Sequence, residues 1–331
     1  MDLDTTTMET TAEESDVKNT SDVDIIEDEE DEEEEQVSDL LQLLETAETL
    51  QLSSVDSTVQ LVHAQTIISN LTSILAESQN RYGPRASSIK ERAIYSLTRT
   101  YCATTQFDSI VDLLTGSTCR GFFDHSTKAK CAKVVRAVLD LLCSISPDQF
   151  DIQAQVCRNV IAWCKTEKRT FLRQRVETKL AAVLFSQKEY SAALIMIDEL
   201  LLELKKLDDK QLLVEAHLLQ SKIHHALRGI AKAKAALTAS RTCANAIYVA
   251  PALQATIDSM SGILHCEEGD YNTAHSYFLE AFESLDTLND KEKALQCLKY
   301  MMLCRILDSL NKALKLSAKG GVGKQIICYD S

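Results

Sequence analysis

Apolar side chains recur at helical spacing along the centre of the chain. From Tyr190 they fall at steps of three and four residues, on one face of an α-helix, at Tyr190, Ala193, Leu194, Ile197, Leu201, Leu204 and Leu207. A second stripe follows the acidic pair Asp208 and Asp209, at Leu212, Ala216, Leu219, Ile223 and Leu227. Aspartate is a favoured N-cap and glycine a favoured stop. The pattern therefore predicts two consecutive helices, the second of which ends at Gly229.

The junction between these helices is repeated along the chain. A large anchor residue is followed three positions later by a small one, in the pairs Tyr190 and Ala193, Ile230 and Ala233, and Tyr271 and Ala274. Weaker copies are Phe107 with Ile110 and Phe150 with Gln153, and the five anchors are separated by 43, 40, 40 and 41 residues. This period exceeds the roughly 34 residues of a strict tetratricopeptide repeat. It predicts an all-α fold, an α-solenoid of tetratricopeptide-like helix pairs with a period of about 40 residues, in which the small residues lie at close helix crossings.

Further helices are predicted on both sides of this region. Apolar periodicity indicates them at residues 40–47, 55–77, 86–104 and 127–145, and a last helix at 292–310. Two of the three prolines, Pro147 and Pro251, stand at plausible first helical positions.

Charge divides the chain into parts. Residues 1–39 hold 18 Asp or Glu and one Lys, which leaves 31 acids and 34 bases in residues 40–331. The nine consecutive acids Glu27–Glu35 favour a solvated segment, either a plain solubilising tail or an arm for a basic partner. We therefore expect three parts: a disordered acidic tail over 1–39, the helical-repeat solenoid over 40–310, and a short C-terminal tail over 311–331.

The same acidic start is unlike a signal peptide, and no stretch approaches the ~18 apolar residues of a membrane span. We therefore expect a soluble intracellular protein. Its 11 cysteines fit that view, because Cys157 and Cys164, like Cys297 and Cys304, share a helix face where free thiols act as small hydrophobes. Without CxxC pairs, no metal site is predicted.

One segment near the end resembles a phosphate-binding loop. Residues 319–325 read KGGVGKQ, but the first glycine of GxxxxGK is replaced by Ala318 and the hydroxyl that would hold magnesium by Gln325. A predicted helix also stands where a strand should precede the loop. A nucleotide-binding enzyme that uses Lys324 is therefore a minor alternative, and we predict no catalytic residue and no cofactor.

Basic residues cluster on two predicted helices, the segment after Thr127 and the segment around residue 170. In the second cluster, Lys165, Lys168, Arg169 and Arg173 are the candidate partner-binding residues. Such a cluster is either a solvated helix face or a docking surface for an acidic partner. Nucleic acid is disfavoured because residues 40–331 have a near-balanced charge and no aromatic-interleaved basic motif.

Several strings also resemble a known family. TKAKCAKVVRAVLDLL (127–142), WCKTEKRTFLRQRVETKL (163–180) and DYNTAHSYFLEAF (270–282) are similar to a family of non-ATPase lid subunits of the 26S proteasome regulatory particle. The similarity extends over about residues 90–306. Members of that family continue into a PCI module with a winged helix, whereas this chain continues as SLNKALKLSAKGGVGKQIICYDS (309–331).

The resemblance implies a non-catalytic scaffold in ubiquitin-dependent protein degradation. In that family the solenoid bridges the lid to the ATPase ring and to the α-ring of the core particle. The partners implied are these proteasome subunits, with no nucleic acid and no membrane, in the cytoplasm and nucleus. The related scaffold subunit of the COP9 signalosome is the alternative of the same class.

Overall fold

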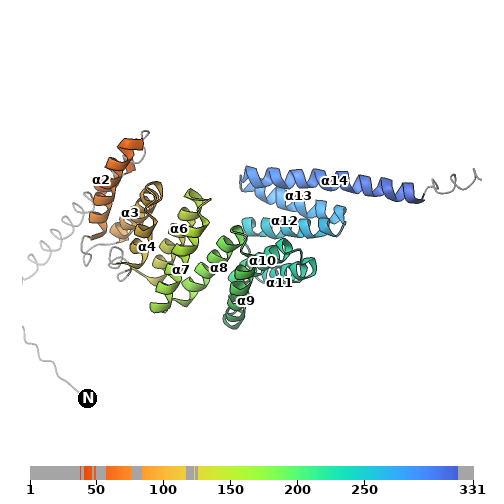
Figure 1. The fold of residues 1–331 in the computed structure, drawn as a ribbon, viewed down its shortest axis with the longest axis horizontal. Helices are drawn as coiled ribbons and strands as arrows, with labels where there is room; N and C mark the ends of the chain where they lie inside the picture. Colours follow the sequence, from red (N-terminus) through yellow and green to blue (C-terminus); the bar gives the residue numbers. More distant parts are fainter. Residues whose placement is uncertain are drawn as a thin grey trace, which may run out of the picture. The chain divides into compact units, whose positions relative to one another are not determined.

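The structure is a computed structural model that describes residues 57–76, 84–116 and 126–319, together with residues 38, 41–46, 48, 49 and 123. Every element in these ranges is an α-helix (Figure 1). The acidic block Glu27–Glu35 and the loop-like segment around Lys324 lie outside the described residues. The all-α solenoid predicted from the sequence is confirmed.

The chain divides into two compact units, Met1–Pro147 and Asp148–Ser331. The first contains α2 (Ser57–Ala76), α3 (Pro84–Ala103) and α6 (Lys128–Ile145), which are close to predicted helices, and α4 (Phe107–Thr115), for which no range was predicted. Helix α3 packs against both α2 and α6. Its Ile94 and Leu97 are fully buried, as is Val134 of α6, and Lys133 of α6 forms an ion pair of 2.9 Å with Glu91 of α3.

The second unit is a run of helices of similar length that begin every 20 or 21 residues. They are α7 (Phe150–Thr166), α8 (Thr170–Ser186), α9 (Tyr190–Leu207), α10 (Lys210–Ala226), α11 (Ile230–Asn245), α12 (Pro251–Glu267), α13 (Tyr271–Thr287) and the longer α14 (Lys291–Lys319). Each of them packs on the next helix in sequence. Since two helices make one repeat, this spacing accounts for the period of about 40 residues.

One turn geometry joins most of these helices. Two residues before a helix begins, the backbone is left-handed, with φ between 53° and 81°, at Thr105, Lys168, Lys188, Asp208, Arg228, Gly269 and Asn289. At the end of α10, for example, the amide of Gly229 donates to the carbonyl of His224 (2.8 Å) and that of Arg228 to His225 (2.9 Å). This pair of bonds is the Schellman motif, which satisfies the last carbonyls of a helix.

The repeat anchors mark the helix starts. Phe107, Phe150, Tyr190, Ile230 and Tyr271 are the first residues of α4, α7, α9, α11 and α13. The small partners Ala193, Ala233 and Ala274 are fully buried, which agrees with their predicted place at close crossings.

Two local predictions were wrong. Gly229 does not supply the left-handed stop of α10: it has φ −86° as the N-cap of α11, and Arg228 takes the left-handed position at φ 61°. Pro147 does not begin a helix, because α7 starts three residues later at Phe150, whereas Pro251 does begin α12. The predicted last helix extends further than expected, to Lys319.

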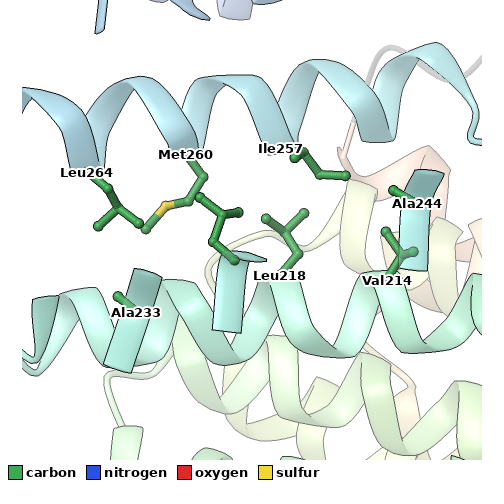
Figure 2. Close-up of a cluster of buried hydrophobic side chains, with 8 residues drawn as sticks. Val214, Leu218, Ala233, Ala244, Ile257, Met260 and Leu264 are labelled. Carbon is green, nitrogen blue, oxygen red and sulfur yellow. The ribbon is translucent and has the colours of Figure 1, made fainter. Parts of the chain in front are cut away.

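The core of the second unit combines small and large apolar side chains from neighbouring helices. Figure 2 shows one cluster, in which α10, α11 and α12 contribute Val214, Leu218, Ala233, Ala244, Ile257, Met260 and Leu264. Hydroxyl groups bridge α10 and α11 directly: Ser221 Oγ donates to the carbonyl of Ala233 at 2.8 Å, and Ser240 Oγ to that of Val214 at 2.9 Å. The two backbones can therefore approach each other, and the buried serine hydroxyls find hydrogen-bond acceptors in the facing helix.

The cysteines of α7 and α14 are core residues. Cys157, Cys164, Cys297 and Cys304 are each at most 3% exposed, which confirms the prediction of buried thiols. Burial raises the pKa of Cys102 and of Cys164 to about 11, so these thiols are protonated at neutral pH.

Candidate protein-interaction surface

The predicted basic residues gather at the turn from α7 to α8. Lys165 lies in the last turn of α7, Lys168 has the left-handed conformation (φ 53°), and Arg169 is the N-cap of α8. The amide of Arg169 donates to the carbonyl of Cys164 at 2.9 Å, which fixes the turn. The backbone therefore presents the two lysines at one end of this helix pair, and both side chains are exposed.

Arg169 is held against its own unit. Its guanidinium carbon lies 4.9 Å from the centroid of the Trp163 ring, a cation–π contact. Its Nη1 is buried and has no hydrogen-bond partner among the described residues. The aromatic ring thus fixes the direction of this cation.

Arg173 is paired internally. Its Nη1 donates to Glu177 Oε1 of α8 at 3.1 Å, and its Nη2 to Glu203 Oε2 of α9 at 2.5 Å. This hydrogen bond from Arg173 lowers the pKa of Glu203, whereas burial raises the pKa of Glu177 despite the neighbouring cation. The guanidinium therefore joins α8 to α9.

The four predicted residues thus divide by environment. Lys165 and Lys168 are exposed and form no ion pair with a described residue, whereas Arg169 and Arg173 are partly buried and in contact with their own unit. The partner-binding role of the four stays a prediction. We define the α7–α8 surface as Lys165, Lys168 and Phe171.

Phe171 is the member of this surface that sequence reasoning missed. It is the second residue of α8 and is 67% exposed, whereas the apolar residues Leu172, Val176 and Leu180 of the same helix are buried. Its signal in the sequence was its place outside that stripe, since an aromatic residue off the apolar face is left in water. Aromatic residues are enriched in surfaces that contact other proteins, so the exposed Phe171 is a candidate contact residue.

Other classes of site find no support in the described part of the chain. Residues 57–76, 84–116 and 126–319 contain no group of three His, Cys, Asp or Glu that could hold a metal ion. Within the same residues, none of the helices is long and apolar enough to cross a membrane.

A succession of helix pairs that pack on their sequence neighbours, with small residues at the crossings, defines an α-helical repeat protein. Residues 42–187 match the family described as the 26S proteasome regulatory subunit RPN6 N-terminal domain. The resemblance inferred from the sequence is thereby confirmed, and it extends to proteins named 26S proteasome non-ATPase regulatory subunit 11.

Three curated relatives illustrate the similarity. The chain is 51% identical over 226 residues to the 26S proteasome non-ATPase regulatory subunit 11 homolog of Arabidopsis thaliana, covering 68% of this chain and 53% of the relative. It is 45% identical to the subunit 11 of Dictyostelium discoideum, covering 71% and 56%, and 47% identical to the regulatory subunit RPN6 of Saccharomyces cerevisiae, covering 60% and 49%. The chain spans about half the length of the curated relatives it matches.

Among solved structures, BtubC from P. vanneervenii is 12% identical in sequence and aligns with 77% of this chain and 92% of that chain, with a TM-score of 0.45. The similarity to 26S proteasome subunits rests on the sequence relatives.

Proposed function

We propose that this protein is a non-catalytic scaffold subunit of the lid of the 26S proteasome regulatory particle, acting in ubiquitin-dependent protein degradation. The observation that carries the proposal is the identity of 51% over 226 residues and 45% over 235 residues with proteins named as subunit 11. The partners would be other lid subunits, the ATPase ring and the α-ring of the core particle, and the location would be the cytoplasm and nucleus. Proteasome names among the relatives favour this complex over the COP9 signalosome.

The α7–α8 surface is the proposed contact with one of these partners. Its two lysines have no ion pair within the described residues, and Phe171 is largely in water, so an acidic segment with an apolar residue would complement both features. Arg169 and Arg173 lie next to this surface in the sequence and are in contact with side chains of their own unit. Reversal of their charge would disturb the Trp163 contact and the link to Glu203, and is therefore not a clean test of binding.

The chain offers a matched pair for the test. Lys168 and Lys188 are both exposed, both left-handed (φ 53° and 66°) and occupy the same position in consecutive turns, 20 residues apart. Tagged full-length chains that carry Lys168→Glu or Lys188→Glu should be expressed in cells and captured, and the co-purified proteins quantified by mass spectrometry. We expect proteasome subunits with the wild type, several-fold less of them with Lys168→Glu and with Phe171→Ala, and no change with Lys188→Glu.

Two failures have separate meanings. Capture of COP9 signalosome subunits in place of proteasome subunits, or of neither, would overturn the proposed function. Equal recovery of proteasome subunits with Lys168→Glu and Lys188→Glu would contradict the proposed contact at the α7–α8 surface and would leave the proposed scaffold function unaffected.

A further inference from the structure

Among the residues that the structure describes, helix α14 has a long apolar face that no other helix covers. Eight of its large apolar side chains are between 37% and 70% exposed: Leu295, Leu298, Met302, Leu303, Ile306, Leu307, Leu310 and Leu314. We call this set the α14 stripe. Steps of three and four residues relate its members, so they share one broad side of the helix over about five turns. Lys299 is the cation that lies within it.

The opposite side of α14 is already used. Ala294, Cys297 and Cys304 are buried, and Cys304 packs with Ala274 and Phe278 of α13. Helix α14 is therefore apolar on two sides, one packed on α13 and one bare. It is also 29 residues long against 17 in α13, and Figure 1 shows its C-terminal part running past the end of α13. Leu310 and Leu314, 55% and 70% exposed, belong to this extension.

A hollow beside the stripe adds to its apolar area. A cavity of about 530 Å³ lies between α12, α13 and α14, and three of its lining residues, Leu303, Ile306 and Leu307, belong to the α14 stripe. Ile263 and Phe278 line its inner side. The apolar surface is thus continuous from the bare helix into a depression on its flank.

The stripe is large enough to form a stable interface. Eight large side chains, each about half exposed, present on the order of 700 Å², close to the ~800 Å² per partner of a standard interface. Monomeric proteins rarely expose contiguous apolar patches beyond ~300–600 Å². Leu303, Leu307, Leu310 and Leu314 follow one another at steps of four, three and four residues, the spacing by which one helix pairs with a like helix.

We propose that the α14 stripe pairs with the α14 stripe of a second copy of this chain, in antiparallel orientation. The pairing rests on the eight apolar side chains of the stripe, and Lys299 and the small Ser309 are polar residues on the same side of the helix. In a parallel pair the two Lys299 ammonium groups would face each other, which is unfavourable. An antiparallel pair with complete overlap sets Lys299 beside Leu310 of the second copy, and Leu295 beside Leu314, so that each lysine stem lies on a leucine with its ammonium in water.

The oligomeric state of the full chain tests the interface. Wild type should show a concentration-dependent monomer–dimer equilibrium in sedimentation velocity. The double variant Met302→Glu/Ile306→Glu should raise the dissociation constant about 100-fold or more, because pairing would remove both carboxylates from water. These side chains are 62% and 54% exposed, so the fold tolerates the change. The matched control is Ile195→Glu/Leu202→Glu on α9, where the exposures are 63% and 64%, and it should dimerise as the wild type does.

Cross-linking tests the orientation. Leu295→Cys chains mixed with Leu314→Cys chains under mild oxidation should form the mixed disulfide dimer, above the background of wild type treated alike. Like-with-like cross-links in its place would overturn the antiparallel arrangement. A monomer at all concentrations, or a dimer unaffected by Met302→Glu/Ile306→Glu, would overturn the proposal. A monomer whose double variant loses a different co-purifying protein would also overturn it and would assign the stripe to that protein.

Discussion

Gly262 of α12 lies against the ring of Phe278 of α13. A Cβ atom placed at Gly262 would be 2.8 Å from Cε1 and 2.9 Å from Cδ1 of the ring, closer than real side chains approach. Phe278 is itself 2% exposed and has the Tyr300 ring at 5.2 Å on another side. The absence of a side chain at residue 262 therefore allows α12 and α13 to pack at their observed spacing.

Replacement of Gly262 by Ala should destabilise the protein. The helix would gain about 1 kcal/mol in propensity, but overlap with the enclosed ring costs about 1–3 kcal/mol, and more when the ring cannot move. We expect a lower midpoint in urea unfolding. In the Phe278→Leu background the same change should cost less, so a double-mutant cycle should give a coupling of about 1 kcal/mol. Independent effects of the two changes would contradict the contact.

Ala233 offers a second test of close crossing. It is fully buried and its carbonyl accepts the hydrogen bond from Ser221 of α10, so Ala233→Leu forces a larger side chain between α11 and α10. We expect a loss of about 1–3 kcal/mol in unfolding free energy. Ala235 is two residues away on the same helix and exposed, and Ala235→Leu should be nearly neutral. Equal melting temperatures for the two variants would contradict the assignment of Ala233 to the crossing of α11 and α10.

The left-handed turns predict a stabilising substitution. Lys188 has φ 66°, a conformation that costs a residue with a Cβ about 1–2 kcal/mol and glycine almost nothing. Lys188→Gly should therefore raise the unfolding free energy by about 1 kcal/mol. Lys205→Gly, within α9, should lower it by up to about 1 kcal/mol through lost helix propensity. Chemical denaturation of both variants measures these changes in unfolding free energy. A lower unfolding free energy for Lys188→Gly would contradict the left-handed turn geometry.

Asp258 predicts a pH dependence. It is 5% exposed and accepts hydrogen bonds from Gln254, and burial raises its pKa above the ordinary 3.8. A raised pKa in the folded state means that the stability from this group is complete below pH 3.8 and is lost as pH rises through the folded value. Asp258→Asn should therefore melt higher than wild type at pH 7.

The advantage of Asp258→Asn should narrow as the pH is lowered toward 3.8, where the wild-type carboxyl takes up its proton. The exposed Asp286→Asn is the control, and it should track the wild type throughout. Melting curves between pH 4 and pH 7 provide the measurement. A difference between Asp258→Asn and wild type that is constant over this range would refute the assignment.

The sequence revealed the helices and their period because both depend on local spacing. Tyr190 and Tyr271 could be recognised as repeat anchors since a helix start recurs at each anchor and, in three of the five, a small residue follows three positions later. The left-handed stop of α10 was predicted one residue too late, at Gly229, because the prediction relied on the general preference for glycine at a left-handed helix end. Glycine is the usual left-handed residue, but the Schellman bonds at this turn place Arg228 there and leave Gly229 to begin the next helix.

The candidate surface was less accessible to sequence reasoning. Lys165, Lys168, Arg169 and Arg173 form one basic cluster in the sequence, and nothing in their spacing separates the exposed lysines from the arginines. Arg169 is set apart by its contact with Trp163, and Arg173 by its ion pairs with Glu177 and Glu203. Glu203 is 30 residues from Arg173 and meets it through the packing of α8 on α9, a tertiary contact with no local signature.

The buried thiols allow local opening of each unit to be followed by their chemical reaction. Cys102 lies in the first unit, and Cys164 and Cys304 lie near the two ends of the second, each protonated because burial holds its pKa near 11. An alkylating reagent needs thiolate and access, so it can reach these sulfur atoms only while the surrounding helices are open. The order in which the three react under native conditions would therefore rank how readily the helices around each thiol open.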